Sequence, residues 1–196
     1  MTGAGSPSGG RLRLAAAGDT GAITELMAVS VRALFPRYYD EQQTASAARY
    51  IARLDPQLVD DGTYFVCEDA DGIIACGGWS RRGRLYTGSG VHAGDDRVLD
   101  PARDAAHVRA MFVRPDRTRQ GLGRAILEAA EAAARSEGFT RLDLMATLPG
   151  VPLYRAFGFA EVERLPVVMP DGVAIEGVVM DRPIERGGPS PRALVG

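Results

Sequence analysis

The stretch at residues 108–135 constrains the fold of this chain more than any other, because it reads as a strand, a glycine turn and a helix in succession. Residues 108–113 (VRAMFV) are a short apolar run that predicts a buried strand. Gly121 and Gly123 follow a polar turn, and apolar residues then recur at helical spacing until Gly138. A strand that enters a helix through a glycine turn suggests an anion-binding site.

The first turn of such a helix attracts phosphate. Its backbone N–H groups lack intrahelical partners and carry the positive end of the helix dipole. The two glycines have no Cβ atom that would hold a pyrophosphate away from the backbone. Further donors in the same turn are Arg117, Arg119, Gln120 and Arg124.

The turn lacks two common phosphate-binding motifs. It has no Gly-x-x-x-x-Gly-Lys-Ser/Thr pattern, and the whole chain contains no lysine. The third small residue of the dinucleotide fingerprint is also missing, because Ile126 stands at its position. A nucleotide site at this turn is therefore an alternative that predicts affinity for ATP or NAD.

The spacing of residues 118–123 instead resembles the acyl-CoA pyrophosphate loop of the GCN5-related N-acetyltransferases (the GNAT family), Gln/Arg-x-x-Gly-x-Gly/Ala. Thr118 stands where the family has Gln or Arg, and arginines on both sides of it supply positive charge. Residues 153–159 (LYRAFGF) resemble a second family motif, Phe/Leu-Tyr-x-x-x-Gly-Phe, and follow a predicted strand at 141–147. Together the two motifs extend the resemblance over roughly residues 62–181.

The resemblance implies an α/β domain with the GNAT fold: a mixed, strongly twisted sheet of about six to seven strands with helices on both faces. We place the N-acetyltransferase domain at residues 11–184. The Gly/Ser/Pro-rich segment 1–10 is expected to be disordered, and the Gly/Pro-rich tail 185–196 to be flexible. The other predicted strands are 11–15, 161–169 and 173–180, with a hairpin at 63–80.

Two helices are predicted before the hairpin. Asp19 can cap the first helix, which ends or bends at Pro36, and Asp40 can cap the second, at residues 41–54, which Asp55-Pro56 closes. Family members usually contact the acceptor substrate between these helices. The predicted acceptor contacts are Phe35, Tyr38, Tyr39 and Trp79, with core packing as the alternative for aromatic residues at such a junction.

Composition points to one soluble enzyme domain. The net charge of -2 and the pI near 5.7 give no reason to expect a nucleic-acid partner. No apolar run approaches 18 residues, so we expect no membrane segment and a cytoplasmic location. If Asp71-Gly72 is a two-residue hairpin turn, Cys67 and Cys76 are cross-strand neighbours, which we interpret as reduced core thiols. No residues have metal-ligand spacing, so no metal is predicted.

The mechanism implied by the resemblance is direct acetyl transfer from acetyl-CoA to a primary amine of a small molecule or peptide in a ternary complex. Tyr154 occupies the motif's tyrosine position, where it would protonate the leaving thiolate. Some relatives place a glutamate base fourteen positions before the first motif glycine, and here that position is His107. Its ordinary pKa of about 6.5 suits a general base, and deprotonation through ordered water is the alternative.

The cofactor is expected to bind through backbone groups of the central strand and through the glycine turn. The predicted contacts are Met111, Phe112, Val113, Thr118, Arg119, Gln120, Gly121, Leu122, Gly123 and Arg124. The next strand of the family normally leads to a cofactor-binding asparagine, but this chain has Leu148-Pro149-Gly150 and no asparagine anywhere.

Three matters stay open from sequence. A non-catalytic acyl-CoA-binding module on the same fold is the competing class, because fold alone does not define activity. Dimers are common in the family, so a homodimer is one expected assembly. The stretch 81–104 is unusually long and polar, and a functional loop or a merely solvated one fits it. Its carboxylates are Asp95, Asp96, Asp100 and Asp104.

Overall fold

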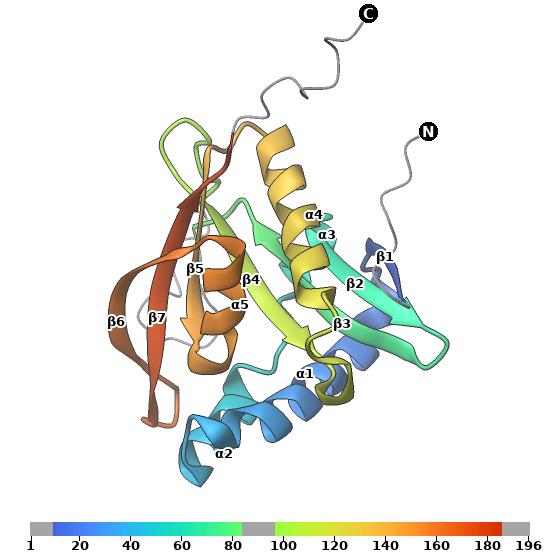
Figure 1. Ribbon diagram of the computed structural model, residues 1–196, viewed down its shortest axis with the longest axis vertical. Helices are drawn as coiled ribbons and strands as arrows, with labels where there is room; N and C mark the ends of the chain where they lie inside the picture. Colours follow the sequence, from blue (N-terminus) through green and yellow to red (C-terminus); the bar gives the residue numbers. More distant parts are fainter. Residues whose placement is uncertain (1–9, 84–96, 186–196) are drawn as a thin grey trace, which may run out of the picture.

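The structure is a computed structural model that describes residues 10–83 and 97–185 of the 196-residue chain. In this described part, seven strands form one sheet in the order β1-β2-β3-β4-β5-β7-β6 (Figure 1). The strands are β1 (Arg11–Leu14), β2 (Tyr64–Asp69), β3 (Gly72–Ser80), β4 (Ala106–Val113), β5 (Arg141–Thr147), β6 (Ala160–Val168) and β7 (Ala174–Pro183). Neighbouring strands are antiparallel except for the parallel pair β4 and β5. The predicted mixed sheet is confirmed.

Helices cover both faces of the sheet. The α-helices are α1 (Thr20–Leu34), α2 (Glu41–Tyr50), α3 (Pro56–Asp60), α4 (Leu122–Ser136) and α5 (Val151–Phe157). Single 3-10 turns are η1 (Ala17–Asp19), η2 (Phe35–Arg37), η3 (Pro115–Arg117) and η4 (Leu148–Gly150). One core cluster joins α1, α2 and α3 to the sheet, and two others pack α4 and α5 against its opposite face.

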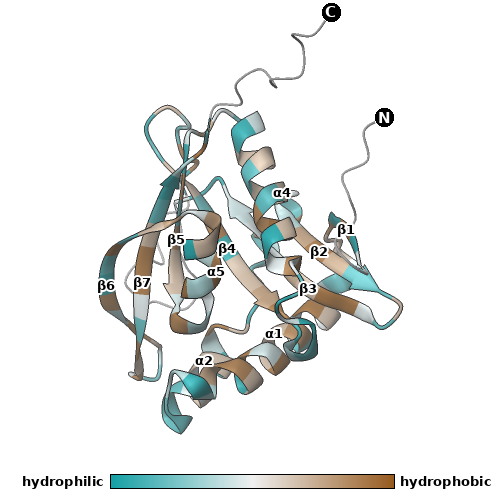
Figure 2. Cartoon of the chain, in the orientation of Figure 1, coloured by the Kyte–Doolittle hydropathy of each residue, from teal (hydrophilic) through white to brown (hydrophobic). Residues whose placement is uncertain are grey.

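Helix α4 shows why the sequence pattern predicts this packing. Its buried residues recur at helical spacing and face the sheet: Leu122, Ile126, Leu127, Ala130 and Ala134. Figure 2 shows the polar outer side of the same helix in teal. Gly138 ends the helix with φ +93°, while the N–H of the buried Phe139 donates to the Ala134 carbonyl at 3.2 Å. This glycine C-cap matches the predicted helix end.

The helices before the hairpin differ from the sequence prediction. The second helix ends at Tyr50 instead of Leu54, and a separate short helix, α3, follows it. The side chain of Asp55 accepts a hydrogen bond from the Gln57 N–H, so Asp55 begins α3 with Pro56 in its first turn. Proline is compatible with that position because its fixed φ suits the first turn and its missing N–H is not needed there.

The two aspartates predicted as helix caps behave differently. Asp40 caps α2 as expected, since its carboxylate accepts from the Gln43 N–H at 2.8 Å. Asp19 does not bond to the N–H groups of α1. Its carboxylate accepts from the Ala16 N–H and from Arg13 instead, and this pairing lowers the pKa of Asp19. It therefore stabilises the turn that leads into α1.

The predicted pairing of the two cysteines is wrong. Cys67 lies opposite Ala75, and Cys76 lies opposite Val66. The hairpin turn is Ala70-Asp71 and not Asp71-Gly72, since Asp69 pairs with Gly72, and the register of β2 and β3 shifts further between Cys67 and Glu68. The thiols consequently belong to core clusters on opposite faces of the sheet. Both are free and buried, and burial raises the pKa of Cys76 to about 12. Each acts as an apolar core side chain.

Parts of the predictions fall outside the described residues. These parts are nearly all of the N-terminal segment 1–10, the tail after residue 185, and residues 84–96 of the long polar stretch. The two ends of that stretch are joined, since Arg82 and Val98 form an isolated antiparallel bridge. The domain boundaries stay predictions.

Candidate functional site

The site lies where β4 and β5 separate. Their parallel pairing is restricted to Ala106 with Leu142 and His107 with Asp143. Beyond these residues the two strands diverge (Figure 1), and within the described chain β4 has no β5 partner as far as Val113. A pocket of about 610 Å³ opens between them and reaches the glycine turn, α5 and the junction of α1 with α2.

A β-bulge shapes the β4 side of this pocket. Arg109 pairs with Gly78 and Phe112 pairs with Cys76, so Ala110 and Met111 both stand opposite the intervening glycine, residue 77. Ala110 has φ +52°, a conformation that is costly for a residue with a Cβ. The buried hydroxyl of Tyr64 donates to the Ala110 carbonyl at 2.6 Å and stabilises the bulge. Bulges bend a strand, and this one lies where β4 borders the pocket.

The glycine turn forms the second wall. Gly121 is the N-cap residue of α4 with φ +81°, a left-handed conformation that favours glycine. The N–H of Ala125 donates to the Gly121 carbonyl at 3.0 Å, so the N–H groups of residues 122–124 precede the helical ladder. The turn residues that line the pocket are Arg117, Thr118, Arg119, Gly121, Leu122, Gly123 and Arg124. The predicted Gln120 is exposed and not among them.

Gly123 also makes room for a neighbouring helix. A Cβ added to this buried residue would lie 2.8 Å from a methyl group of Leu153. Its small size therefore lets α5 pack closely against the start of α4. Because α5 carries Tyr154, this packing positions the tyrosine beside the glycine turn.

The three arginines of the turn differ in their partners. Arg117 pairs with Asp69 at 3.0 Å and with Asp71 at 2.9 Å, which ties the turn to the β2–β3 hairpin. Arg124 pairs with Glu128 at 2.9 Å. Arg119 is exposed, lines the pocket and has no ion pair or hydrogen bond with any described residue. It is thus the arginine most available to an anion at this turn.

Tyr154 lies on the pocket wall and is 8 % exposed. A Cβ added to Gly150 would lie 2.9 Å from the tyrosine ring, so the glycine makes room for it. The ring also packs edge-on against Phe159 at a centroid distance of 5.8 Å. Burial raises the pKa of the Tyr154 hydroxyl above its ordinary value. The side chain is therefore a neutral phenol that can donate a proton.

His107 does not line the pocket. It lies where β4 and β5 are still paired, and its Nδ1 contacts the carboxylate of Asp143 on the neighbouring strand. The structure brings Tyr154, the glycine turn and residues 111–113 to one pocket but leaves His107 at the closed end of the strand separation.

The four predicted acceptor contacts divide in two. Phe35 and Tyr38 line the pocket. Tyr39 does not, because its hydroxyl accepts from the Leu148 N–H at 2.8 Å and donates to the Glu176 carbonyl at 2.7 Å. It joins the α1–α2 junction to η4, the segment that stands where the family has its asparagine. Trp79 is 1 % exposed and packs edge-on against Phe139 in the core, so a substrate contact does not fit its position.

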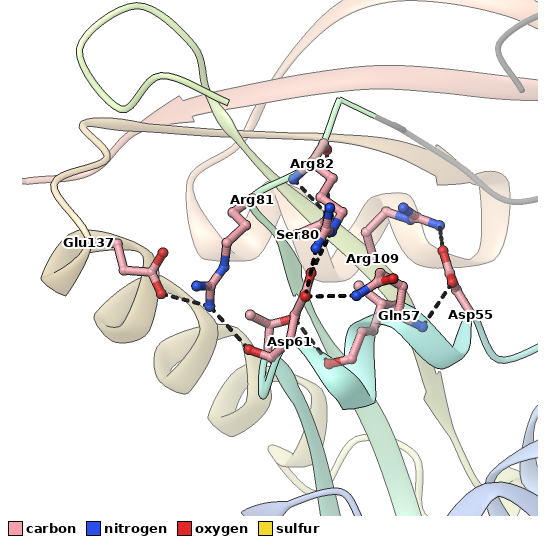
Figure 3. Close-up of polar contacts among 10 residues, drawn as sticks. Asp55, Gln57, Asp61, Ser80, Arg81, Arg82, Arg109 and Glu137 are labelled. Carbon is pink, nitrogen blue, oxygen red and sulfur yellow. Dashed lines mark hydrogen bonds and ion pairs between the residues drawn. The ribbon is translucent and has the colours of Figure 1, made fainter. Parts of the chain in front are cut away.

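Two further arginines border the pocket, Arg37 and Arg109. Arg37 belongs to the junction where the acceptor was expected, whereas no role was predicted for Arg109. Arg109 is 3 % exposed, and its guanidinium lies 3.4 Å from a carboxylate oxygen of Asp55. Figure 3 shows this pair beside a polar network in which Asp61 accepts from Arg82 and Gln57. An arginine inside the apolar run 108–113 was the available signal for Arg109. For Arg37 the sequence signal was its place between aromatic residues at the predicted acceptor junction.

Comparisons with known proteins agree with this architecture. A family model described as "Acetyltransferase (GNAT) domain" matches residues 60–161. One similar solved structure is a GCN5-related N-acetyltransferase from Rhodopseudomonas palustris, with a TM-score of 0.69, 17% identity, and coverage of 92% of this chain and 99% of that one. A search of curated proteins found no match.

Two other similar structures contain the coenzyme. PaiA N-acetyltransferase from Thermoplasma acidophilum, in complex with coenzyme A, has a TM-score of 0.62 and 13% identity, with coverage of 89% of this chain and 98% of that one. YncA from Salmonella typhimurium, a putative acetyltransferase with acetyl-CoA, has a TM-score of 0.59 and 18% identity, with coverage of 95% and 99%.

The family match covers more than half of the chain, and the chain belongs to the GNAT acetyltransferase family, a class of acyltransferases. In the part that the structure describes, no helix combines the length and hydropathy needed to cross a membrane. The cytoplasmic location and the homodimer stay predictions.

Proposed function

We propose that this protein transfers the acetyl group of acetyl-CoA directly to a primary amine of a small molecule or peptide. The observation that carries the proposal is one pocket that joins the glycine turn, the unpaired edge of β4 and Tyr154. Structural relatives described as complexes with coenzyme A or acetyl-CoA support the choice of donor.

In this proposal the glycine turn binds the pyrophosphate of the donor. The N–H groups of residues 122–124 supply hydrogen bonds, and Arg119 supplies charge. The pantetheine arm lies along the β4 edge at residues 111–113, where strand separation leaves backbone groups without β5 partners. Met111 contributes mainly its backbone, because its sulfur lies directly over Gly77.

The chemistry follows from the position and protonation state of Tyr154. The amine nitrogen attacks the thioester carbonyl carbon, so that a C–N bond forms and the C–S bond breaks. The leaving thiolate takes the proton of the Tyr154 hydroxyl, which the raised pKa keeps protonated at neutral pH. The tyrosine then recovers a proton from solvent.

The amine must also lose a proton. Within residues 10–83 and 97–185, no aspartate, glutamate or histidine lines the pocket. We therefore assign this proton to water that enters with the acceptor and do not assign the general base to His107. Replacing His107 with glutamine should then leave the pH dependence of the rate unchanged. If the variant no longer shows a rise in rate with pH that the wild type shows, His107 is the general base.

Calorimetry with acetyl-CoA, CoA, ATP and NAD tests the proposal. We expect binding of the two CoA species alone, with a dissociation constant in the micromolar range, or about -8 kcal/mol at 1 μM. Thiol release in the presence of an amine panel then separates an enzyme from a non-catalytic acyl-CoA-binding module. Binding of ATP or NAD in place of CoA would contradict the assignment of the glycine turn.

A further inference from the structure

The proposed acceptor side of the pocket, near the junction of α1 and α2, carries a positive charge that is not part of the proposed acetyl-CoA site. Arg37 lies at the end of η2, between α1 and α2, and lines the pocket from a segment separate from the glycine turn. Its side chain is exposed, lines the pocket and has no hydrogen bond or ion pair with any described residue. A guanidinium in this position can meet an incoming ligand without first losing a partner.

Negative charge on the same wall is missing from the described residues. One carboxylate that contacts a residue of the pocket lining is Asp55, which pairs with the buried guanidinium of Arg109. Asp55 lines a separate, smaller pocket of about 290 Å³ that shares Arg109 with the large one. The described residues thus make the acceptor side electrostatically unfavourable for an amine with further positive charges.

The remainder of the acceptor side is apolar. Side chains from α1, η2, the C-cap of α2, β6 and β7 form this surface: Leu34, Phe35, Ile51, Val167 and Ile175. Apolar surface of this kind favours a hydrophobic body on the ligand, since its contact removes apolar area from water. One free guanidinium at the edge of an apolar surface matches a ligand with one acid group and one apolar group.

We propose that the acceptor is a small amine that carries an acid group and an apolar body, of the kind found in hydrophobic α-amino acids, and that Arg37 binds the acid. Arginine is suited to this role because its planar guanidinium pairs with both oxygens of a carboxylate. The inference rests on the proposed acetyl transfer and names the class of amine that receives the acetyl group.

The test compares amines that differ only in the acid. One series is L-leucine, L-leucinamide and 3-methylbutan-1-amine, and a second is L-phenylalanine, L-phenylalaninamide and 2-phenylethylamine, each read by thiol release from acetyl-CoA. We expect the acids to have values of kcat/KM at least about 10-fold above the amides and amines, the size of a charged hydrogen bond. Because the carboxylate keeps its neighbouring amine more protonated, intrinsic reactivity favours the amides and cannot produce this preference.

Variants of Arg37 test whether this side chain causes the preference for amines that carry a carboxylate. Arg37→Gln should raise KM for the acids about 10-fold or more, with little change in kcat, in KM for the amides or in KM for acetyl-CoA. Arg37→Glu should reverse the order of acids and amides. Arg32→Gln is the matched control, because Arg32 is an exposed arginine of α1 that does not line the pocket between β4 and β5 but a separate one.

Calorimetric binding of acetyl-CoA is measured on every variant, so that failure of the donor site is seen separately. If acetyl-CoA binds but the amides and simple amines react as well as the acids, or no acid reacts, the acceptor assignment is overturned while the donor site stands. A preference for acids that Arg37→Gln leaves intact overturns the role of Arg37. No binding of acetyl-CoA overturns the proposed function itself.

Discussion

The two halves of the pocket are built from different kinds of groups. The donor half consists of the N–H groups at the start of α4, the edge of β4 and the single available guanidinium of Arg119. The proposed acceptor half consists of side chains from α1, η2, the C-cap of α2, β6 and β7, and its Arg37 has no ion pair with any described residue. Backbone groups recognise a chemical feature common to all acyl-CoA molecules, whereas side chains adapt one chain to one acceptor.

Tyr154 stands on the wall of the pocket that we propose for both ligands, and its replacement should have the largest effect. Tyr154→Phe removes the proton for the thiolate, and we expect kcat to fall about 100-fold or more with unchanged binding of acetyl-CoA. Thiol release and calorimetry measure the two quantities. An unchanged kcat would mean that protonation of the thiolate does not depend on this residue, and an inactive wild type that binds acetyl-CoA would favour the non-catalytic module.

Variants of the adjacent residues Tyr38 and Tyr39 should distinguish a tyrosine that stabilises the fold around the pocket from one that only lines it. Tyr39→Phe leaves the Leu148 N–H and the Glu176 carbonyl without their buried partner, and we expect a loss of about 2 kcal/mol in the free energy of unfolding. Tyr38→Phe is the control, since Tyr38 is 47 % exposed and should change this free energy little. Urea denaturation measures both, and equal effects would contradict the bridging role of Tyr39.

The donor half should be sensitive to backbone conformation at Gly121. Gly121→Ala forces a Cβ into the left-handed region and shifts the N–H groups that follow, so we expect binding of acetyl-CoA to weaken about 10-fold. Gly172→Ala is the matched control, because Gly172 has φ +83° and, like Gly121, nothing within 4 Å of an added Cβ, but lies in the β6–β7 turn. Both variants should lose about 1 kcal/mol of stability, and only the first should lose affinity in calorimetry.

The smallest expected effect comes from the charges of the glycine turn. Arg119→Gln should weaken binding of acetyl-CoA about 5-fold, and the loss should shrink as salt is added because Arg119 is exposed. Arg124→Gln should have less effect, since Arg124 already pairs with Glu128. Titrations at two salt concentrations compare them. Equal losses of affinity for acetyl-CoA in the two variants would show that the ion pair with Glu128 does not reduce the contribution of Arg124 to binding.

Much of the fold and the donor half could be predicted from sequence because local patterns specify them. The strand at 141–147 and the helix that begins beyond Gly121 were predicted almost to the residue. Residues 118–123 and 153–159 predicted which turn and which tyrosine would meet, and the structure places both in one pocket. Glycine requirements and apolar periodicity act over a few residues, so a single sequence reveals them.

The acceptor half was predicted less well because burial there depends on distant segments. Tyr38 and Tyr39 are neighbours in sequence, but η2 directs one to the pocket and the other to Leu148, more than one hundred positions away. Trp79 lies near the end of the apolar strand β3, whose next partner, β4, lies beyond the long polar stretch. No local pattern tells which of these aromatic residues faces the pocket.

The sequence alone determined the central unit of strand, glycine turn and helix, the glycine at the start of α4 and the family, because these depend on local steric and hydrogen-bonding preferences. Only the tertiary structure decided that Cys67 and Cys76 occupy opposite faces, that His107 stays outside the pocket and that Arg37 borders it. A one-residue change of register moves a side chain to the other face of a sheet, and the β-bulges that cause such changes are stabilised by residues far away in the chain. Tyr64, whose hydroxyl bonds to the bulged Ala110, is the clearest case in this protein.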